Sequence, residues 1–103
     1  MNNVSLFVDV SANFKRINHL TNGGGSLSSN VSGYNKYLAL FCANVASGHT
    51  GHHFNISGCG SSMLIQFECF GVAIGVALLT SNGTFNVSFT TGWVRTLTIW
   101  GID

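Results

Sequence analysis

Apolar and polar residues alternate with a period of two along most of this chain, which is the pattern of β-strands rather than of helices. In the segment TFNVSFT, Phe85, Val87 and Phe89 point to one side of an extended chain and the polar residues between them point to the other. A last segment near the C-terminus is rich in Thr, Ile, Val and Trp, which favour strands. Strands are predicted on these grounds at residues 4–10, 53–57, 62–70, 84–90 and 93–100.

Glycine and serine residues separate the predicted strands. Residues 21–33 contain three consecutive glycines and several serines, and they predict a flexible connection. Asn82-Gly83 predicts a type I′ hairpin turn. Residues 12–20 fit either a strand or a short helix, because their apolar positions are three apart. The chain is therefore predicted to be all-β, an antiparallel sandwich or jelly-roll-like fold of about seven strands, with residues 1–33 as an N-terminal strand and connection and residues 34–103 as the sandwich domain.

Two further predicted strands, 36–44 and 72–79, are apolar on both faces. A strand without a polar face must be covered on both sides, and a lone sandwich of this size covers only one. The second face is therefore expected to meet another copy of the chain, with a loop or the N-terminal segment as the alternative cover. The small residues Ala73, Gly75 and Ala77 allow close approach of backbones between two copies. Together with the large apolar residues Tyr37, Phe41 and Leu79, they are predicted to supply the contact between copies.

Composition narrows the classes of protein. Of the 103 residues 46% are hydrophobic, which excludes a disordered chain. Only 7% are charged, against roughly 25% in an ordinary domain. The net charge of +1 argues against a nucleic-acid partner. The longest apolar stretch, residues 70–79, is about half the length of a membrane span, so no membrane insertion is expected.

Three histidines, His49, His52 and His53, fall in one Gly-rich loop. Imidazole is a common metal ligand, but their spacing matches no zinc motif and no carboxylate or cysteine pair is near them. We therefore expect an exposed polar loop and no metal or other cofactor. His49 and His52 are the alternative candidate ligands, and a threefold axis that tripled them would favour a metal site. Three scattered carboxylates give no acid–base pair, so the chain is not expected to be an enzyme.

The three cysteines allow at most one disulfide. Cys42 and Cys69 lie within apolar strands and are expected to behave as small hydrophobic residues. Cys59 lies between two glycines and is expected to be more exposed. Arg95 lies in an apolar strand and is expected to be buried beside a carboxylate.

The surface is expected to be polar but uncharged. Hydroxyl and amide side chains alternate along the last strands: Thr84, Asn86, Ser88, Thr90, Thr96 and Thr98. Aromatic residues near strand ends, together with polar loops, suit sugars, which present an apolar face and many hydroxyls. The residues predicted to bind such a receptor are His49, His52, His53, Tyr34 and Trp93.

Three stretches carry a family resemblance: YNKYLALF at 34–41, HFNISG at 53–58 and TLTIWG at 96–101. With them, the segment from residue 34 onward resembles the distal head domains of bacteriophage tail fibres and tailspikes. The resemblance implies a trimeric β-sandwich in the virion, assembled in the host cytoplasm. It also implies recognition of a host-surface glycan or protein, with copies of the chain and other virion proteins as further partners. It carries over no catalytic residue.

Two other functions fit the same sequence. A capsid decoration or cement protein is also a small, charge-poor, oligomeric β domain. A cellular carbohydrate-binding module has the same neutral polar surface and no viral role.

Overall fold

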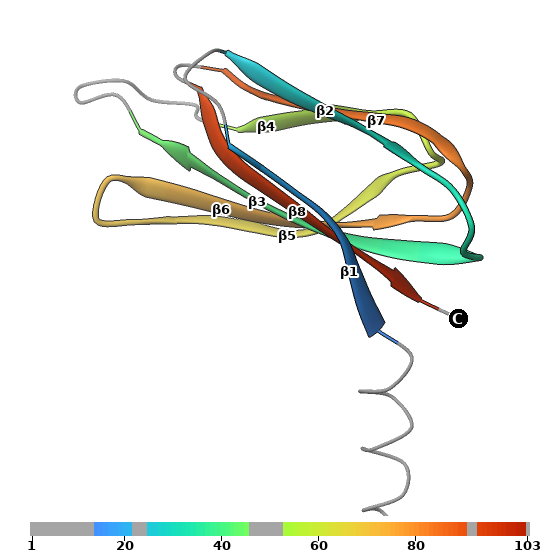
Figure 1. Ribbon diagram of the computed structural model, residues 1–103. Coiled ribbons are helices and arrows are strands. Elements are labelled where there is room, and N and C mark those ends of the chain that lie inside the picture. Colours follow the sequence, from blue (N-terminus) through green and yellow to red (C-terminus); the bar gives the residue numbers. More distant parts are fainter. Residues whose placement is uncertain (1–13, 22–24, 46–52, 91–92, 103) are drawn as a thin grey trace, which may run out of the picture.

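The computed structural model describes residues 14–21, 25–45, 53–90 and 93–102, and these residues contain strands and no helix (Figure 1). The prediction of an all-β fold is confirmed, with eight strands in the described residues instead of about seven. The strands are β1 (Phe14–Thr21), β2 (Ser26–Val31), β3 (Lys36–Asn44), β4 (Phe54–Ser57), β5 (Ser62–Cys69), β6 (Val72–Leu79), β7 (Gly83–Phe89) and β8 (Val94–Ile102).

The strands form two antiparallel sheets that pack face to face as a sandwich (Figure 1). The larger sheet has the order β1-β8-β3-β6-β5, and the smaller sheet has the order β2-β7-β4. Strands β5 and β4 are edge strands of the two sheets and lie next to each other. The two strands from residues 1–33 that the structure describes, β1 and β2, pair with β8 and β7.

The ambiguous segment 12–20 is a strand from Phe14 onward, because β1 pairs with β8. A register shift between Arg16 and Asn18 inserts Ile17 as an extra residue. This bulge converts strand alternation into the spacing of three that made a helix possible. Ile17 and Leu20 then both pack against the core.

Residues 26–31 are the strand β2, so the prediction of a flexible connection was wrong for them. Leu27, Ser29 and Val31 are buried and the alternate residues are exposed. The glycines and serines around this strand hid a regular alternation. The strand predicted at residues 4–10 lies outside the described residues.

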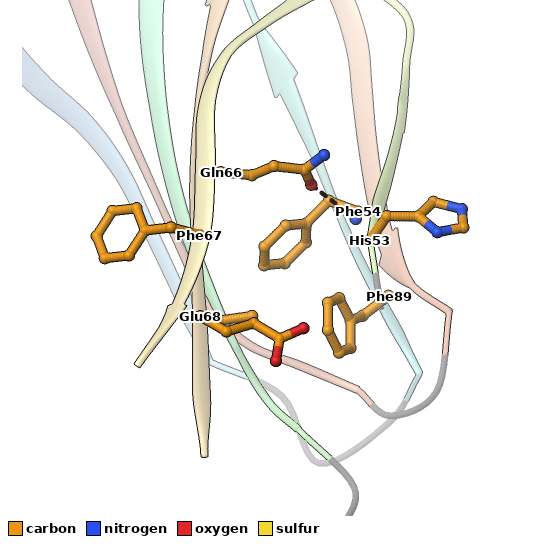
Figure 2. Close-up of a pocket in the computed structure, with 7 residues that line it drawn as sticks. His53, Phe54, Gln66, Phe67, Glu68 and Phe89 are labelled. Carbon is orange, nitrogen blue, oxygen red and sulfur yellow. Dashed lines mark hydrogen bonds between the residues drawn. The ribbon is translucent and has the colours of Figure 1, made fainter. Parts of the chain in front are cut away.

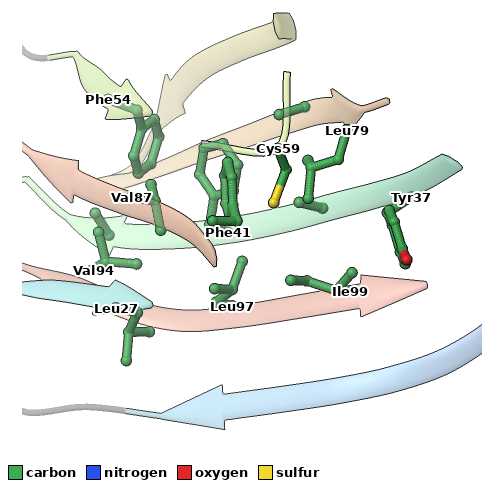
Figure 3. Close-up of a cluster of buried hydrophobic side chains, with 14 of the residues drawn as sticks. Leu27, Tyr37, Phe41, Phe54, Cys59, Leu79, Val87, Val94, Leu97 and Ile99 are labelled. Atoms are coloured by element: carbon green, nitrogen blue, oxygen red, sulfur yellow. The ribbon is translucent and has the colours of Figure 1, made fainter. Parts of the chain in front are cut away.

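The core lies between the sheets, with Phe41 of β3 at its centre (Figure 3). The Phe41 ring contacts the rings of Phe54 and Phe85, at centroid distances of 4.8 and 6.1 Å. Gly75 faces it across the β3–β6 pair, where a Cβ atom would lie 2.3 Å from Phe41 Cε2. The position of Gly75 therefore leaves no room for a side chain, because the aromatic ring occupies the space beside it.

The residues predicted to contact another copy are in this core. All six are buried within the single chain: Tyr37, Phe41, Ala73, Gly75, Ala77 and Leu79. The prediction that they form a contact between copies was therefore wrong in its choice of face. Alternation separates the two faces of a strand, but it does not say which face meets the second sheet.

The turns also differ from expectation. Residues 80–82 connect β6 and β7, which lie in different sheets, so Asn82-Gly83 is not a hairpin turn. The hairpin is between β5 and β6, where Phe70 and Gly71 both have positive φ angles, 52° and 79°. Positive φ at both central residues is the geometry of a type I′ turn.

Candidate functional site

A pocket of about 340 Å³ opens where the edge strands of the two sheets meet (Figure 2). Strand β5 contributes Gln66 and Glu68, and the smaller sheet contributes Phe54 and Phe89. The complete lining is His53, Phe54, Gln66, Phe67, Glu68, Ala73 and Phe89.

The register of β5 places the polar groups of this pocket. Gln66 pairs with Gly75 and Glu68 pairs with Ala73, so both side chains lie on the inner face of the larger sheet. They point toward Phe54 and Phe89 in Figure 2. The side-chain oxygen of Gln66 accepts a hydrogen bond of 3.1 Å from the backbone N–H of Phe54. This bond joins the edge strands at the pocket.

Two aromatic rings form the apolar wall of the pocket. The rings of Phe54 and Phe89 have centroids 4.8 Å apart and are inclined by 52°. Both side chains are 6% exposed, so their positions are fixed by the core. Glu68 is exposed and is the charged residue among those that line the pocket. An apolar wall opposite a carboxylate and an amide suits a small ligand with hydroxyl groups, and the volume is at the low end for ligand pockets.

The structure brings one of the five predicted receptor-binding residues to this pocket. His53 lines it, but its imidazole points away from Gln66 and Glu68 (Figure 2). Its carbonyl oxygen accepts hydrogen bonds from the backbone N–H and the hydroxyl of Thr90. Tyr34 is half-buried and its ring lies over Gly101, while Trp93 is 51% exposed. The remaining two, His49 and His52, lie outside the described residues, as does any metal site built on them.

Sequence reasoning missed the pocket residues Gln66 and Glu68. On β5 these polar residues alternate with Ile65 and Phe67, so the pattern placed them on the solvent side. In the structure they face inward, and Ile65 and Phe67 face outward with 53% and 49% exposure. The smaller sheet ends beside β5, which gives inward polar groups on this strand access to water.

The outer face of the smaller sheet is polar and uncharged. Three rows of paired residues cross it, and they include three of the predicted surface residues; Thr90 follows at the end of β7. The exposed and half-buried polar side chains of this face are Ser26, Ser28, Asn30, Asn55, Ser57, Thr84, Asn86, Ser88 and Thr90. The Ser28 hydroxyl donates a hydrogen bond to the side-chain oxygen of Asn86. A shallow depression of about 290 Å³ lies over β4 and β7 on this face. The predicted neutral surface is therefore confirmed for this sheet.

The other two predicted surface residues, Thr96 and Thr98, are on the larger sheet. Thr96 is half-buried, and Thr98 is 9% exposed. The Thr98 hydroxyl lies 2.8 Å from Nδ1 of His19 on β1. This pair joins two neighbouring strands and does not form part of an open polar surface.

The cysteines are free, and their exposure is not as expected. Cys59 is 7% exposed, and Cys69 is the exposed one. Burial raises the pKa of the Cys59 thiol. Cys42 is intermediate, as its apolar strand indicated. Arg95 is exposed, which corrects the expectation of a buried ion pair.

In the described part of the chain, no three His, Cys, Asp or Glu side chains come together as a metal site. No helix long and apolar enough to span a membrane occurs in the same residues. Comparison with protein-family models, curated proteins and solved structures finds no match to this chain.

Proposed function

We propose that this protein is a structural subunit of a bacteriophage particle, the tip of a tail fibre or spike, and that it binds a sugar of the host surface. The observation that carries the binding part is the pocket between β4 and β5. Its carboxylate and its amide are groups that hydrogen-bond the hydroxyls of a sugar, and the exposed parts of the Phe54 and Phe89 rings, 6% of each residue, add an apolar wall.

The charge of the pocket limits the class of sugar that it can bind. Glu68 places a carboxylate in the pocket, and no Lys or Arg is among the described residues that line it. A carboxylate accepts hydrogen bonds from hydroxyl or ammonium groups and repels other anions. We therefore expect neutral or amino sugars to bind and acidic sugars to be rejected.

The phage part of the proposal has a different support. It rests on the resemblance of residues 34–41, 53–58 and 96–101 to tail-fibre and tailspike heads. The all-β sandwich agrees with that resemblance. The uncharged outer face of the smaller sheet also suits a surface that meets neutral polysaccharide.

The experiment is an array of neutral, amino and acidic sugars probed with the full chain. Binding to neutral or amino sugars is expected, and the Glu68→Gln variant should lower the affinity by roughly tenfold to a hundredfold, the value of a hydrogen bond to a charged group. Lys36→Gln, which removes a charge at the start of β3, is the matched control and should bind as the parent does. Binding of acidic sugars alone, or equal binding by Glu68→Gln, would contradict the proposal.

A capsid decoration protein is the second candidate. The observation that favours it is the large apolar outer face of the β1-β8-β3-β6-β5 sheet, since a cement protein needs a surface that adheres to a shell. Electron microscopy of particles labelled on this protein would separate the two locations, tail tip and capsid.

A further inference from the structure

The outer face of the larger sheet is apolar on β5, β6 and β3 and at Trp100 and Ile102 of β8, while Thr96 and Thr98 of β8 are polar. Cross-strand pairing aligns the rows Ile65–Val76–Leu40 and Phe67–Ile74–Cys42 on β5, β6 and β3, and a third row continues from β6 to β8. We name this surface the apolar face. Its members are Leu38, Leu40, Cys42, Ile65, Phe67, Cys69, Val72, Ile74, Val76, Leu78, Trp100 and Ile102.

Strand β5 shows most clearly that this face is unsuited to exposure to water. It is an edge strand, and its inner face carries the polar residues Gln66 and Glu68. Its outer face carries Ile65 and Phe67, which are 53% and 49% exposed in the single chain. In Figure 2 the Phe67 ring points away from the sandwich core. Inward-pointing charged residues also occur on the edge strands of soluble monomers, so the unusual feature of β5 is its row of large apolar side chains on the outer face.

We propose that the apolar face is the contact surface between copies of this chain, so that its occupant is the same face of a second copy. This inference goes beyond sugar binding and does not depend on it. It replaces the contact predicted from the sequence, because the residues predicted there are in the core of the single chain.

The area of the face fits this occupant. Strands of eight or nine residues, the four that carry the apolar face side by side, give an area of about 500 Å² at ~4.8 Å between strands and ~3.3 Å per residue. Two such faces bury about 1,000 Å² in total, the smallest area expected of a stable interface. A patch of this size is at the upper end of what soluble monomers expose, and such patches commonly mark interaction sites.

The distribution of charge also favours a second copy. Among the described residues, the cationic Arg16 and Lys36 lie on this side at one end of the sheet, and exposed Arg95 lies at the bulge of β8 near the other end. The centre of the face carries no ionisable group that must be desolvated without a partner. The polar pair beside it, His19 and Thr98, is already hydrogen-bonded at 2.8 Å. An identical surface therefore meets no like charge at its centre, which is the requirement for self-contact.

Two closed arrangements satisfy this contact. Two faces about 10 Å apart around a twofold axis cover each other completely, as stacked sheets do. Around a threefold axis, each face divides its area between contacts with two neighbouring copies, which is the arrangement that the fibre-head resemblance implies. Both bury Ile65 and Phe67, and both leave the outer face of the smaller sheet exposed.

The experiment is light scattering on the full chain at micromolar concentration, with single variants of the two outer faces. Phe67→Arg puts a charge into the apolar face at a position already half exposed, so the fold itself is little affected. Thr84→Arg puts the same charge on the polar face of the smaller sheet and is the matched control. Far-ultraviolet circular dichroism verifies that each variant is folded, and Ile65→Arg replaces Phe67→Arg if that variant is not.

The parent and Thr84→Arg should have the mass of two or three chains. Phe67→Arg should shift to the mass of one chain, with self-association weaker by roughly a hundredfold or more. A parent with the mass of one chain would overturn the proposal, since another part of the chain or a different partner then covers the face. An assembly that Phe67→Arg and Ile65→Arg leave unchanged would also overturn it.

Discussion

Replacing Gly75 with alanine tests whether the small residues of β6 make room for the core or for another copy of the chain. In the structure a Cβ atom at this position lies 2.3 Å from Cε2 of the Phe41 ring. Ordinary contacts between carbon atoms are at about 3.5–4.0 Å. The ring must therefore move by more than about 1 Å to admit the new methyl group.

The ring has little freedom to move. Phe41 is fully buried, and it packs against Phe54 and Phe85. Adding a methylene-sized group to such a core costs about 1–3 kcal/mol of unfolding free energy. For a chain of this length each kcal/mol lowers the melting temperature by roughly 4–8 °C. Gly75→Ala should therefore melt about 5–20 °C below the parent.

The assay is urea unfolding and thermal unfolding at one fixed protein concentration, because self-association also changes the apparent stability. Gly25→Ala is the matched control, since a Cβ atom there meets nothing within 4 Å, and it should unfold as the parent does. A Gly75→Ala variant as stable as the parent would refute the packing argument. If the variant is as stable as the parent but no longer assembles, Gly75 lies in the contact between copies, as the sequence predicted.

Three further predictions concern the cysteines and a buried tyrosine. Labelling of the Phe67→Arg variant, in which the apolar face is left uncovered, with a thiol reagent at pH 7–8 should modify the exposed Cys69 first and the buried Cys59 only as the chain unfolds. Because burial raises the pKa of Cys59 above its ordinary value of 9.0, the folded state holds this proton more tightly, so the contribution of Cys59 to the unfolding free energy should be constant well below pH 9 and fall as the pH rises through 9. The Tyr37 hydroxyl accepts the backbone N–H of Tyr34 at 3.2 Å and donates to the Asn82 side chain, so Tyr37→Phe should lose about 1–2 kcal/mol in urea unfolding.

The strands were predictable because alternation is a local property. A residue and its second neighbour share a face whatever the rest of the chain does. This is why β3, β6 and β7 begin and end within a residue or two of the predicted segments. Strand β2 and the start of β1 were hidden by local composition and by the bulge at Ile17.

The assignment of faces was not predictable, because it depends on how the two sheets meet. In β3, Tyr37 and Phe41 are as apolar as Leu38 and Leu40, so alternation alone does not identify the inner set. In β5, Met63 packs against the core, but the register shift between Met63 and Ile65 turns the apolar residues that follow outward. This change of face hid both Glu68 of the pocket and the outward-facing apolar residues. The choice of face is set by pairing between strands distant in sequence.

The measurement that tests the account most directly is hydroxyl-radical footprinting of the unmodified chain over a range of concentrations. Phe67, on the apolar face, is compared with His53, which is exposed at the edge of the smaller sheet. If copies of the chain meet through the apolar face, oxidation of Phe67 relative to His53 falls as the concentration rises. If the chain stays single, the ratio is the same at every concentration and keeps the value of a half-exposed phenylalanine, which would contradict the account.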